Sequence, residues 1–560
     1  MFFSAPLAIE PLGVDGFGTP AADPLACTGV DDGVLLFEVL ASGGAVSDPY
    51  APSVFGTFPL GTLPYAMRTV GAVPFYFADR SWTARPDDAD TPNRYYEGRA
   101  APLQIQQGTP LPPGSGRPGL TVGQLTVDNT DGQFDTVTRS LGVDLRPIII
   151  KRLPSRAARY ADAVPLFTGV CQGWLAAGNQ LRFTLRDNGW LLSQQLLELY
   201  TGTGGADGTT AIAGQPVLQV YGKCRNVAPQ LVDPALLIYR VHDRLIQAVD
   251  AVRVRGATVS SGGAQASYAA LAGASLAGGT YQVALTASGS FIRLGSSPDG
   301  VVTCDVRGDA VGGYVADTAG ILRRILERRL PSSQLALDSF VSLAARLPGT
   351  IGVLFNETIS VQEAVQRVLT ASYCYLVDLP DGRMAVGQIG LPGAGGMSVN
   401  ASHILNDPSR LELPDTVAPC LWRIAVGYRK NWTVMGDADL VPAPTITEAL
   451  RQEYKQNYRL DGTGLNDSAR LARHPGAIDM VVESLFDDQT DAAALAAQIF
   501  AMFAPGRELW SIPLANTGHR VGINAAINLV WPRGGLQEGR DLRVVGRTYD
   551  GRGVTLLAFG

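Results

Sequence analysis

Short apolar stretches separated by turn residues run through the first 200 residues of the chain. The segments 34–40 and 73–77 are rich in Val, Leu and Phe and are bounded by Gly, Pro and Asp, a pattern typical of β-strands. Over 166–175 and 181–186 apolar and polar residues alternate, and Gly178-Asn179 separates the two runs. Because alternation places the apolar side chains on one face, this spacing predicts a β-hairpin.

The apolar period becomes helical from residue 317 onward. Ile and Leu recur three or four positions apart until Pro331 ends the run, and Asp317 precedes it as an N-cap. A second helix is expected over 338–347. A third begins at Ser360-Val-Gln-Glu363, where the Ser and Glu side chains can satisfy each other's backbone amides as a capping box.

The remaining segments mix strands with helices. The expected elements are strands 281–285 and 301–306 of a small β unit, a hairpin with strands 373–379 and 383–389, a strand at 421–428, a helix-prone stretch at 446–475, a helix over 491–503 capped by Thr490, and closing barrel strands between 509 and 559. Together they predict a mainly β, multidomain protein with β-barrel domains and helix-hairpin α+β units.

Five domains are expected from these elements and from the turn-rich stretches between them. They are a β-rich domain at 1–105, a β-barrel or hairpin domain at 106–200, a β-rich inserted domain at 201–310, an α+β domain at 311–400, and a C-terminal barrel domain with a bracing helix at 401–560.

Composition narrows the class of protein. The 560 residues include 45 Lys and Arg against 51 Asp and Glu, a formal net charge of −6, so a basic nucleic-acid-binding surface is not expected. Hydrophobic residues make up 46% of the chain, which excludes wholesale disorder. Charged residues make up only 17%, below the roughly 25% of an average globular chain. So few charges are consistent with large subunit interfaces.

Neither secretory export nor a membrane anchor is expected. Residues 1–13 carry no Lys or Arg before their apolar stretch and contain Pro6, Glu10 and Pro11, unlike a secretory signal. The least charged stretch, 262–294, consists mainly of Ala, Gly and Ser and is too polar for a membrane-spanning helix.

Cysteines and histidines are spaced too widely to predict a metal site. The six cysteines form no CxxC pair, and the histidines, which are His242, His403, His474 and His519, form no HExxH or HxH motif. We therefore expect reduced, mostly buried cysteines. A catalytic pair of Cys374 with His403 would rest on residue type alone, so Cys374 is expected in the core and His403 on the surface.

Two segments have the spacing of ligand-binding loops but are expected to be turns. Gly114-Ser-Gly-Arg-Pro-Gly119 matches GxGxxG, yet prolines within and before it prevent the helix that a dinucleotide-binding loop must open. Residues 128–135 are similar to a calcium loop, but neither the first nor the last ligand position would hold an acidic residue. Asx hydrogen bonds are expected to close this turn instead.

Adjacent carboxylates occur at Asp87/Asp88 and at Asp487/Asp488. Acid–base chemistry needs carboxyl groups that converge in a cleft, whereas adjacent acids in a turn-rich chain are expected to be solvated. The sequence therefore offers no catalytic, cofactor-binding or metal-ligating residue as a candidate, and no cofactor is expected.

Trp82, Tyr95 and Tyr96 form an aromatic group that has two interpretations. The rings could stack on sugars, or they could belong to a subunit interface or an edge strand. We favour the second interpretation.

A series of segments extends through most of the chain. They are Ser81–Pro86, Asn93–Arg99, Val122–Gly132, Leu166–Gly169, Gln215–Pro229, Leu237–Asp243, the helix-hairpin with the turn Asp381-Gly382, and Val426–Thr433. In this order they resemble the tail-tip (baseplate) proteins of long, non-contractile-tailed bacteriophages and related prophages. The most specific segment is Gln215-Pro-Val-Leu-Gln-Val-Tyr-Gly-Lys-Cys-Arg-Asn-Val-Ala-Pro229. With the closing strands, the resemblance covers about 75–560 and is weakest over the first 70 residues and 256–290.

The resemblance implies a siphophage tail hub, located in the virion at the tail tip. Such proteins usually assemble as homotrimers that adapt a six-fold tube to a three-fold tip. The implied partners are the distal tail protein, the tape measure protein, other baseplate proteins and tail fibres, with the host envelope contacted indirectly. Genomic DNA would pass through the lumen without specific binding, so an acidic or neutral lumen is expected. The units at 311–400 and 477–505 would brace the ring, and no enzymatic activity is expected.

Two other classes of function stay open. A tail-associated hydrolase acting on cell wall or capsule would need converging carboxylates or a Cys/His pair in a cleft. A receptor-binding module for host attachment would bind carbohydrate through Trp82, Tyr95 and Tyr96 or through the 256–290 unit.

Overall fold

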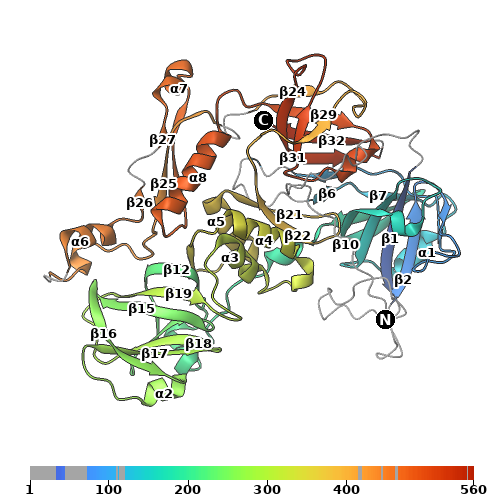
Figure 1. The fold of residues 1–560 in the computed structure, drawn as a ribbon. Helices are drawn as coiled ribbons and strands as arrows, with labels where there is room; N and C mark the ends of the chain where they lie inside the picture. The colour runs from blue at the N-terminus through green and yellow to red at the C-terminus, as the bar shows by residue number, and fades with distance from the viewer. Residues whose placement is uncertain are drawn as a thin grey trace.

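The computed structural model describes residues 33–43, 72–108, 111, 120–413, 419–442, 446–460, 465–551 and 553–560. Within these residues the protein is mainly β. It comprises two curled half-barrel sheets, a nine-stranded sheet, a group of helices between them and a projecting helix–sheet unit (Figure 1). The predicted fold class is confirmed.

The first half-barrel is an antiparallel sheet with the order β2-β1-β9-β10-β11-β7. Its strands are β1 (Val34–Gly43), β2 (Ala72–Ala78), β7 (Leu125–Asp128), β9 (Pro147–Leu153), β10 (Val164–Ala177) and β11 (Gln180–Arg186), with β8 (Leu141–Gly142) beside β1. The predicted hairpin is β10 and β11, and the buried Leu181 and Phe183 alternate with the exposed Arg182 and Thr184. This sheet draws strands from both 1–105 and 106–200.

The second half-barrel has the order β23-β30-β31-β32-β29-β24. Its strands are β23 (Met397–Val399), β24 (Ser409–Leu411), β29 (Leu509–Leu514), β30 (Ala526–Leu529), β31 (Arg540–Tyr549) and β32 (Val554–Phe559), and β5 (Ile105–Gln107) joins β31 to β6 (Leu120–Val122). One hydrophobic core includes Phe37 and Phe167 of the first half-barrel and Leu542 and Leu556 of the second. The two half-barrels therefore pack on each other.

The nine-stranded sheet has the order β13-β14-β18-β17-β16-β15-β19-β12-β20. Its strands are β12 (Gln219–Val227), β13 (Gln230–Asp233), β14 (Ile238–His242), β15 (Ile246–Val254), β16 (Ala257–Gln265), β17 (Thr280–Thr286), β18 (Gly289–Leu294), β19 (Val302–Asp309) and β20 (Gly352–Phe355). The small β unit expected from the strands 281–285 and 301–306 is part of this sheet, as β17 and β19. Sequence reasoning did not find the short helices α2 (Tyr268–Gly273) and α1 (Phe134–Ser140), because their 6 and 7 residues make fewer than two helical turns and are too few to show a period.

Three helices pack beside this sheet. They are α3 (Thr318–Leu326), α4 (Leu337–Arg346) and α5 (Val361–Ser372), and α5 leads into the hairpin of β21 (Cys374–Asp378) and β22 (Met384–Gln388). The Asp317 side chain caps α3 by accepting from the Gly320 amide. Tyr373 has a left-handed backbone with φ of 54°, so β21 begins one residue later than expected.

The predicted capping box at α5 is present. Ser360 Oγ accepts from the Glu363 amide at 3.2 Å, and Glu363 Oε2 accepts from the Ser360 amide at 2.8 Å. We expect Ser360→Ala to lower the free energy of local opening of α5 by about 1 kcal/mol, measured by hydrogen exchange. Ser342→Ala, at an exposed site inside α4, is the control and should cost nothing. Equal effects of the two substitutions would contradict the assignment.

The projecting unit is built on β25 (Leu421–Tyr428), which lies beside α8 (Gln489–Met502) in Figure 1. β28 (Ile478–Glu483) pairs with β25 in parallel, and β26 (Arg459–Leu460) and β27 (Leu465–Asn466) pair with it antiparallel. The helix-prone stretch forms α6 (Glu448–Lys455) and α7 (Ser468–Arg473). The predicted cap of α8 was wrong. Asp488, whose charged carboxylate accepts from the Thr490 amide at 2.8 Å, is the N-cap.

Candidate functional site

The aromatic group does not form a sugar-stacking platform. β3 (Trp82–Thr83) pairs with β4 (Tyr95–Tyr96). Trp82 is only 6% exposed and donates its indole N–H to the Arg156 carbonyl, and the fully buried Tyr96 hydroxyl donates to Glu38 at 2.7 Å. Of the three rings only Tyr95 is exposed. A receptor-binding surface that needs all three rings is therefore not formed.

Cys374 and His403 have separate partners. Cys374 is buried, its Sγ lies 3.5 Å from the Ser372 carbonyl, and burial raises its pKa to about 12. His403 is 2% exposed, so the prediction of a surface histidine was wrong. In the turn at 400–403, its Nδ1 accepts a hydrogen bond from the Asn400 amide. The five cysteines within the described residues are free, as predicted, and Cys27 lies outside them.

The carboxylate pairs are less solvated than expected. Asp87 is exposed and pairs with Arg159, but Asp88 is buried and accepts from the Arg85 amide. Asp487 is partly buried and pairs with the side chains of Lys223 and Arg225. The expectation of solvated turns was wrong for Asp88 and Asp487.

Asx hydrogen bonds close the turn at 128–135, as predicted. Asp128 Oδ1 accepts from the Thr130 amide, Asn129 Oδ1 from the Phe134 amide and Asp131 Oδ1 from the Gln133 amide. Within the described part of the chain, no cluster of His, Cys, Asp and Glu could hold a metal ion. The GxGxxG segment at 114–119 lies outside the described residues.

Of the helices that the described residues form, none combines the length and the apolar character needed to cross a bilayer.

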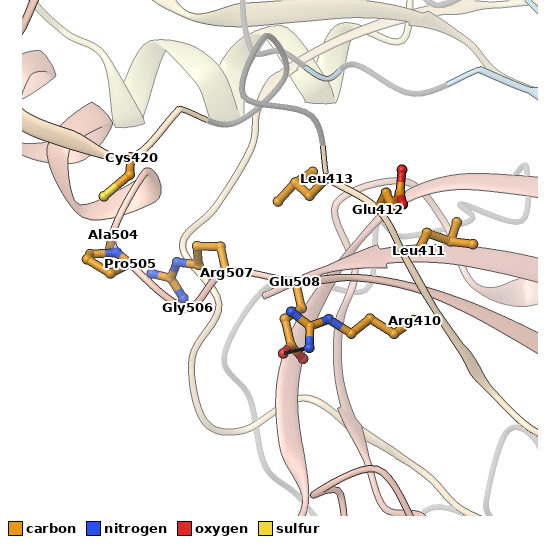
Figure 2. A pocket seen from close by; sticks show the side chains of 10 residues that line it. All are labelled: Arg410, Leu411, Glu412, Leu413, Cys420, Ala504, Pro505, Gly506, Arg507 and Glu508. Carbon is orange, nitrogen blue, oxygen red and sulfur yellow. Dashed lines mark ion pairs between the residues drawn. The ribbon is translucent and has the colours of Figure 1, made fainter. Parts of the chain in front are cut away.

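A pocket of about 420 Å³ lies between β24, β29 and the end of α8 (Figure 2). Arg410–Leu413, Cys420 and Ala504–Glu508 line it. Glu508 pairs with Arg410 at 3.1 Å and with Arg540 at 2.6 Å, while Arg507 donates to the last carbonyls of α8. These charged groups bind the walls of the pocket to each other, so the pocket is not our candidate site.

The candidate site is a group of polar side chains along β12, which we call the β12 junction. Its members are Gln219, Tyr221, Lys223, Arg225 and Asn226 of β12 together with His242, Asp243, Asp309, Arg328, Asn431 and Asp487. β12 pairs with β19 on one side and with β20 on the other. Its other partners are Arg328, which follows α3, and Asn431 and Asp487 of the projecting unit. The junction therefore lies where the nine-stranded sheet, the helices and the projecting unit meet.

Arg328 connects α3 to the nine-stranded sheet. It follows the C-terminal end of α3 and binds Asp243 through two hydrogen bonds, at 2.9 and 3.0 Å. Its Nε donates to the Tyr221 hydroxyl at 3.0 Å, and Tyr221 donates to Gln219 at 2.8 Å. The Arg328 and Asp243 side chains are each only 7% exposed. A bidentate, buried pair of this kind fixes both distance and orientation.

His242 lies within the same group and is completely buried. Its Nδ1 accepts from the Val220 amide at 2.9 Å, and its Nε2 lies 3.1 Å from Asp243 Oδ1 and 3.4 Å from Asp309 Oδ2. Burial by itself raises the pKa of Asp309, but contacts with His242, Arg328 and Arg324 outweigh burial and hold this pKa below its ordinary value.

Asp487 connects β12 to the projecting unit. Arg225 donates two hydrogen bonds to its carboxylate, at 2.6 and 3.0 Å, and Lys223 Nζ lies 2.8 Å from it. Burial by itself raises the pKa of Asp487, yet the hydrogen bonds from Arg225 and Lys223 lower it below its ordinary value. The carboxylate therefore stays ionised at neutral pH.

Asn226 completes the junction. Its Nδ2 donates to Asn431 Oδ1 at 2.9 Å and to the Thr433 carbonyl at 2.6 Å, and its backbone amide donates to Asp305. Asn431 in turn donates to the carbonyls of Tyr454 and Gln456. The junction can therefore hold three structural units in one fixed arrangement.

Sequence reasoning did not identify the junction as a site. It singled out the segments 215–229, 237–243 and 426–433 for their resemblance, but no local pattern in them marks Arg328 or Asp487 as partners. The one available signal was that 215–229, the most specific segment of the resemblance, carries Lys223 and Arg225 two residues apart along a strand.

No protein-family model matches the chain, and no curated protein sequence matches it. Among solved structures, the chain is similar to the 43 kDa tail protein of prophage MuSo2 from Shewanella oneidensis, at 7% identity over 84% of this chain and 96% of that chain, with a TM-score of 0.35. It is similar to the tail protein from Neisseria meningitidis MC58 at 8% identity over 84% and 94%, with a TM-score of 0.38. It is also similar to a chain of the phage P2 baseplate in its activated conformation with Ca, at 9% identity over 62% and 90%, with a TM-score of 0.16. Because these TM-scores are all below 0.5, the function proposed below rests on the sequence and contacts of this chain.

Proposed function

We propose that this chain is a structural subunit of a bacteriophage tail and forms the baseplate hub at the tail tip. In this role it closes the end of the tail tube, docks neighbouring tip proteins and fibres, and opens for the genome. Its partners are the distal tail protein, the tape measure protein and other baseplate proteins, and its action is mechanical.

The convergence of the resembling segments in space carries this proposal. Gln215–Pro229 contains β12, Leu237–Asp243 contributes His242 and Asp243, and Val426–Thr433 contributes Asn431. These segments are far apart in the chain and meet at one junction, where the side chains described above bind protein groups. Residues used in this way hold domains in place, as the framework of an assembly requires.

The paired half-barrels support a ring-forming role. Each copy contributes two curled antiparallel sheets whose apolar residues share one core. Three copies around an axis would therefore present six such sheets, which fits a homotrimer that adapts a six-fold tube to a three-fold tip. We propose that DNA passes through this ring without specific binding, along an acidic or neutral lumen.

Electron microscopy of phage particles labelled with antibody fragments against this chain tests the proposal. We expect label confined to the tail tip with three-fold symmetry. The purified chain should have a mass in solution three times its 59.2 kDa, measured by light scattering. Label along fibres would favour a receptor-binding role, and label absent from the tail would overturn the proposal.

We further propose that the chain has no enzymatic activity. Zymography of the purified chain on host envelopes should give no cleared zone. Clearing would instead favour the tail-associated hydrolase.

A further inference from the structure

The protonation state of His242 is fixed by its hydrogen bond to the backbone. Nδ1 accepts the Val220 amide hydrogen, so the ring hydrogen is on Nε2, which faces the two carboxylates. A second proton on the ring would have to sit on Nδ1, where it would oppose the Val220 N–H and break this bond. Because the ring is 0% exposed, water cannot replace the lost partner.

The charges around His242 are already balanced. Asp243 follows β14, and Asp309 ends β19. Opposite them, α3 contributes Arg324 and the segment that follows it contributes Arg328. Two carboxylates thus face two guanidinium groups, and from β12 the neutral Tyr221 ring contacts His242 edge-on. Burial raises the pKa of Tyr221, so its hydroxyl stays protonated. A proton on His242 would therefore add an uncompensated positive charge in a buried site.

We propose that His242 is an acid-sensitive latch that holds α3 against the nine-stranded sheet. An imidazolium ion at this position competes with Arg328 for Asp243 and Asp309 from within the sheet. Arg328 then loses its carboxylate partners, so α3 separates from the sheet, and the Val220 amide loses its hydrogen bond to His242. The latch is closed at neutral pH and opens in mild acid.

The sign of the effect follows from proton counting. If the closed junction excludes the second proton and the open junction binds it, the open form binds more protons, and its population rises as pH falls. Free histidine takes up this proton near pH 6.5. Between pH 7 and pH 5 the equilibrium constant for opening should therefore rise about 25-fold. Ordinary carboxylates take up protons near pH 4, so this range isolates the histidine from Asp243 and Asp309.

Hydrogen exchange of the full-length chain measures this opening directly. We expect protection factors of the amides at 219–221 and 318–330, corrected for intrinsic exchange, to fall about 25-fold from pH 7 to pH 5. Amides of β31 in the second half-barrel should keep their protection. His242→Gln replaces the ring by a neutral group that can accept and donate, and it should abolish the fall at 219–221.

His474→Gln is the matched control, because His474 is exposed and should leave the wild-type pH dependence unchanged. Unchanged or increased protection at pH 5 in the wild-type chain would overturn the latch, whether or not the His242→Gln variant folds. An equal fall at β31 would also overturn it, because it would report acid destabilisation of the whole chain. So would a fall of the same size in a folded His242→Gln variant.

Discussion

Arg328→Ala should destabilise the β12 junction by about 3–5 kcal/mol, because it leaves the Asp243 carboxylate buried without its cation. Asp243 receives two of its hydrogen bonds from Arg328, and the Gln219 amide and the His242 ring that remain beside it do not replace the bidentate guanidinium. The loss also removes the donor to the Tyr221 hydroxyl. The free energy of opening of the β12 amides, measured by hydrogen exchange at pH 7, reports the effect.

Arg323→Ala is the matched control for this substitution. Arg323 lies in α3 itself, its side chain is 45% exposed, and it pairs with Glu327 at 2.8 Å on the helix surface. Its removal should cost at most about 0.5 kcal/mol. If Arg323→Ala and Arg328→Ala cost the same, the buried pair does not hold α3 to the sheet.

Gly222→Ala should destabilise the same region by about 2–5 kcal/mol, because it combines backbone strain with a steric clash. Gly222 has a φ of +63°, and a Cβ atom placed on it would lie 1.9 Å from the Ile351 carbonyl oxygen. β12 and β20 pair at this point, with Gly222 opposite Gly352. An added methyl group therefore forces the two strands apart, which thermal unfolding and hydrogen exchange of β20 would detect.

Two other glycines separate the causes of this effect. Gly178 has a φ of +57° and nothing within 4 Å of its Cβ position, so Gly178→Ala reports backbone strain alone, about 1–2 kcal/mol. Gly352 has no positive φ, and its Cβ would lie 1.9 Å from the Lys223 carbonyl oxygen, so Gly352→Ala reports the clash. If Gly222→Ala lowers stability no more than Gly178→Ala does, β12 and β20 do not approach each other this closely.

Features that depend on neighbours in the chain were predictable. The hairpin of β10 and β11 follows from alternation around a two-residue turn, and the capping box of α5 follows from Ser360 and Glu363 three residues apart. The misplaced cap of α8 shows the limit of such rules, because Asp488 and Thr490 both suit an N-cap and only the observed hydrogen bond distinguishes them.

Pairing between strands distant in sequence was beyond these rules. The first half-barrel pairs β1 with β9, and β20 of the α+β unit completes the nine-stranded sheet beside β12. Strand periodicity indicates which side chains share a face, but it does not specify the partner strand, because each edge offers the same backbone donors and acceptors.

The difference between what the sequence determines and what tertiary contacts decide is clearest at the β12 junction. Amino-acid order alone indicated a mainly β chain, its local turns and caps, and the segments that resemble tail-tip proteins. It assigned Asp487 to a solvated turn and His403 to the surface, and it gave Arg328 no role. Tertiary contacts reversed these assignments, because the burial and ionisation of a side chain depend on partners that folding brings from distant parts of the chain, such as Arg225 for Asp487.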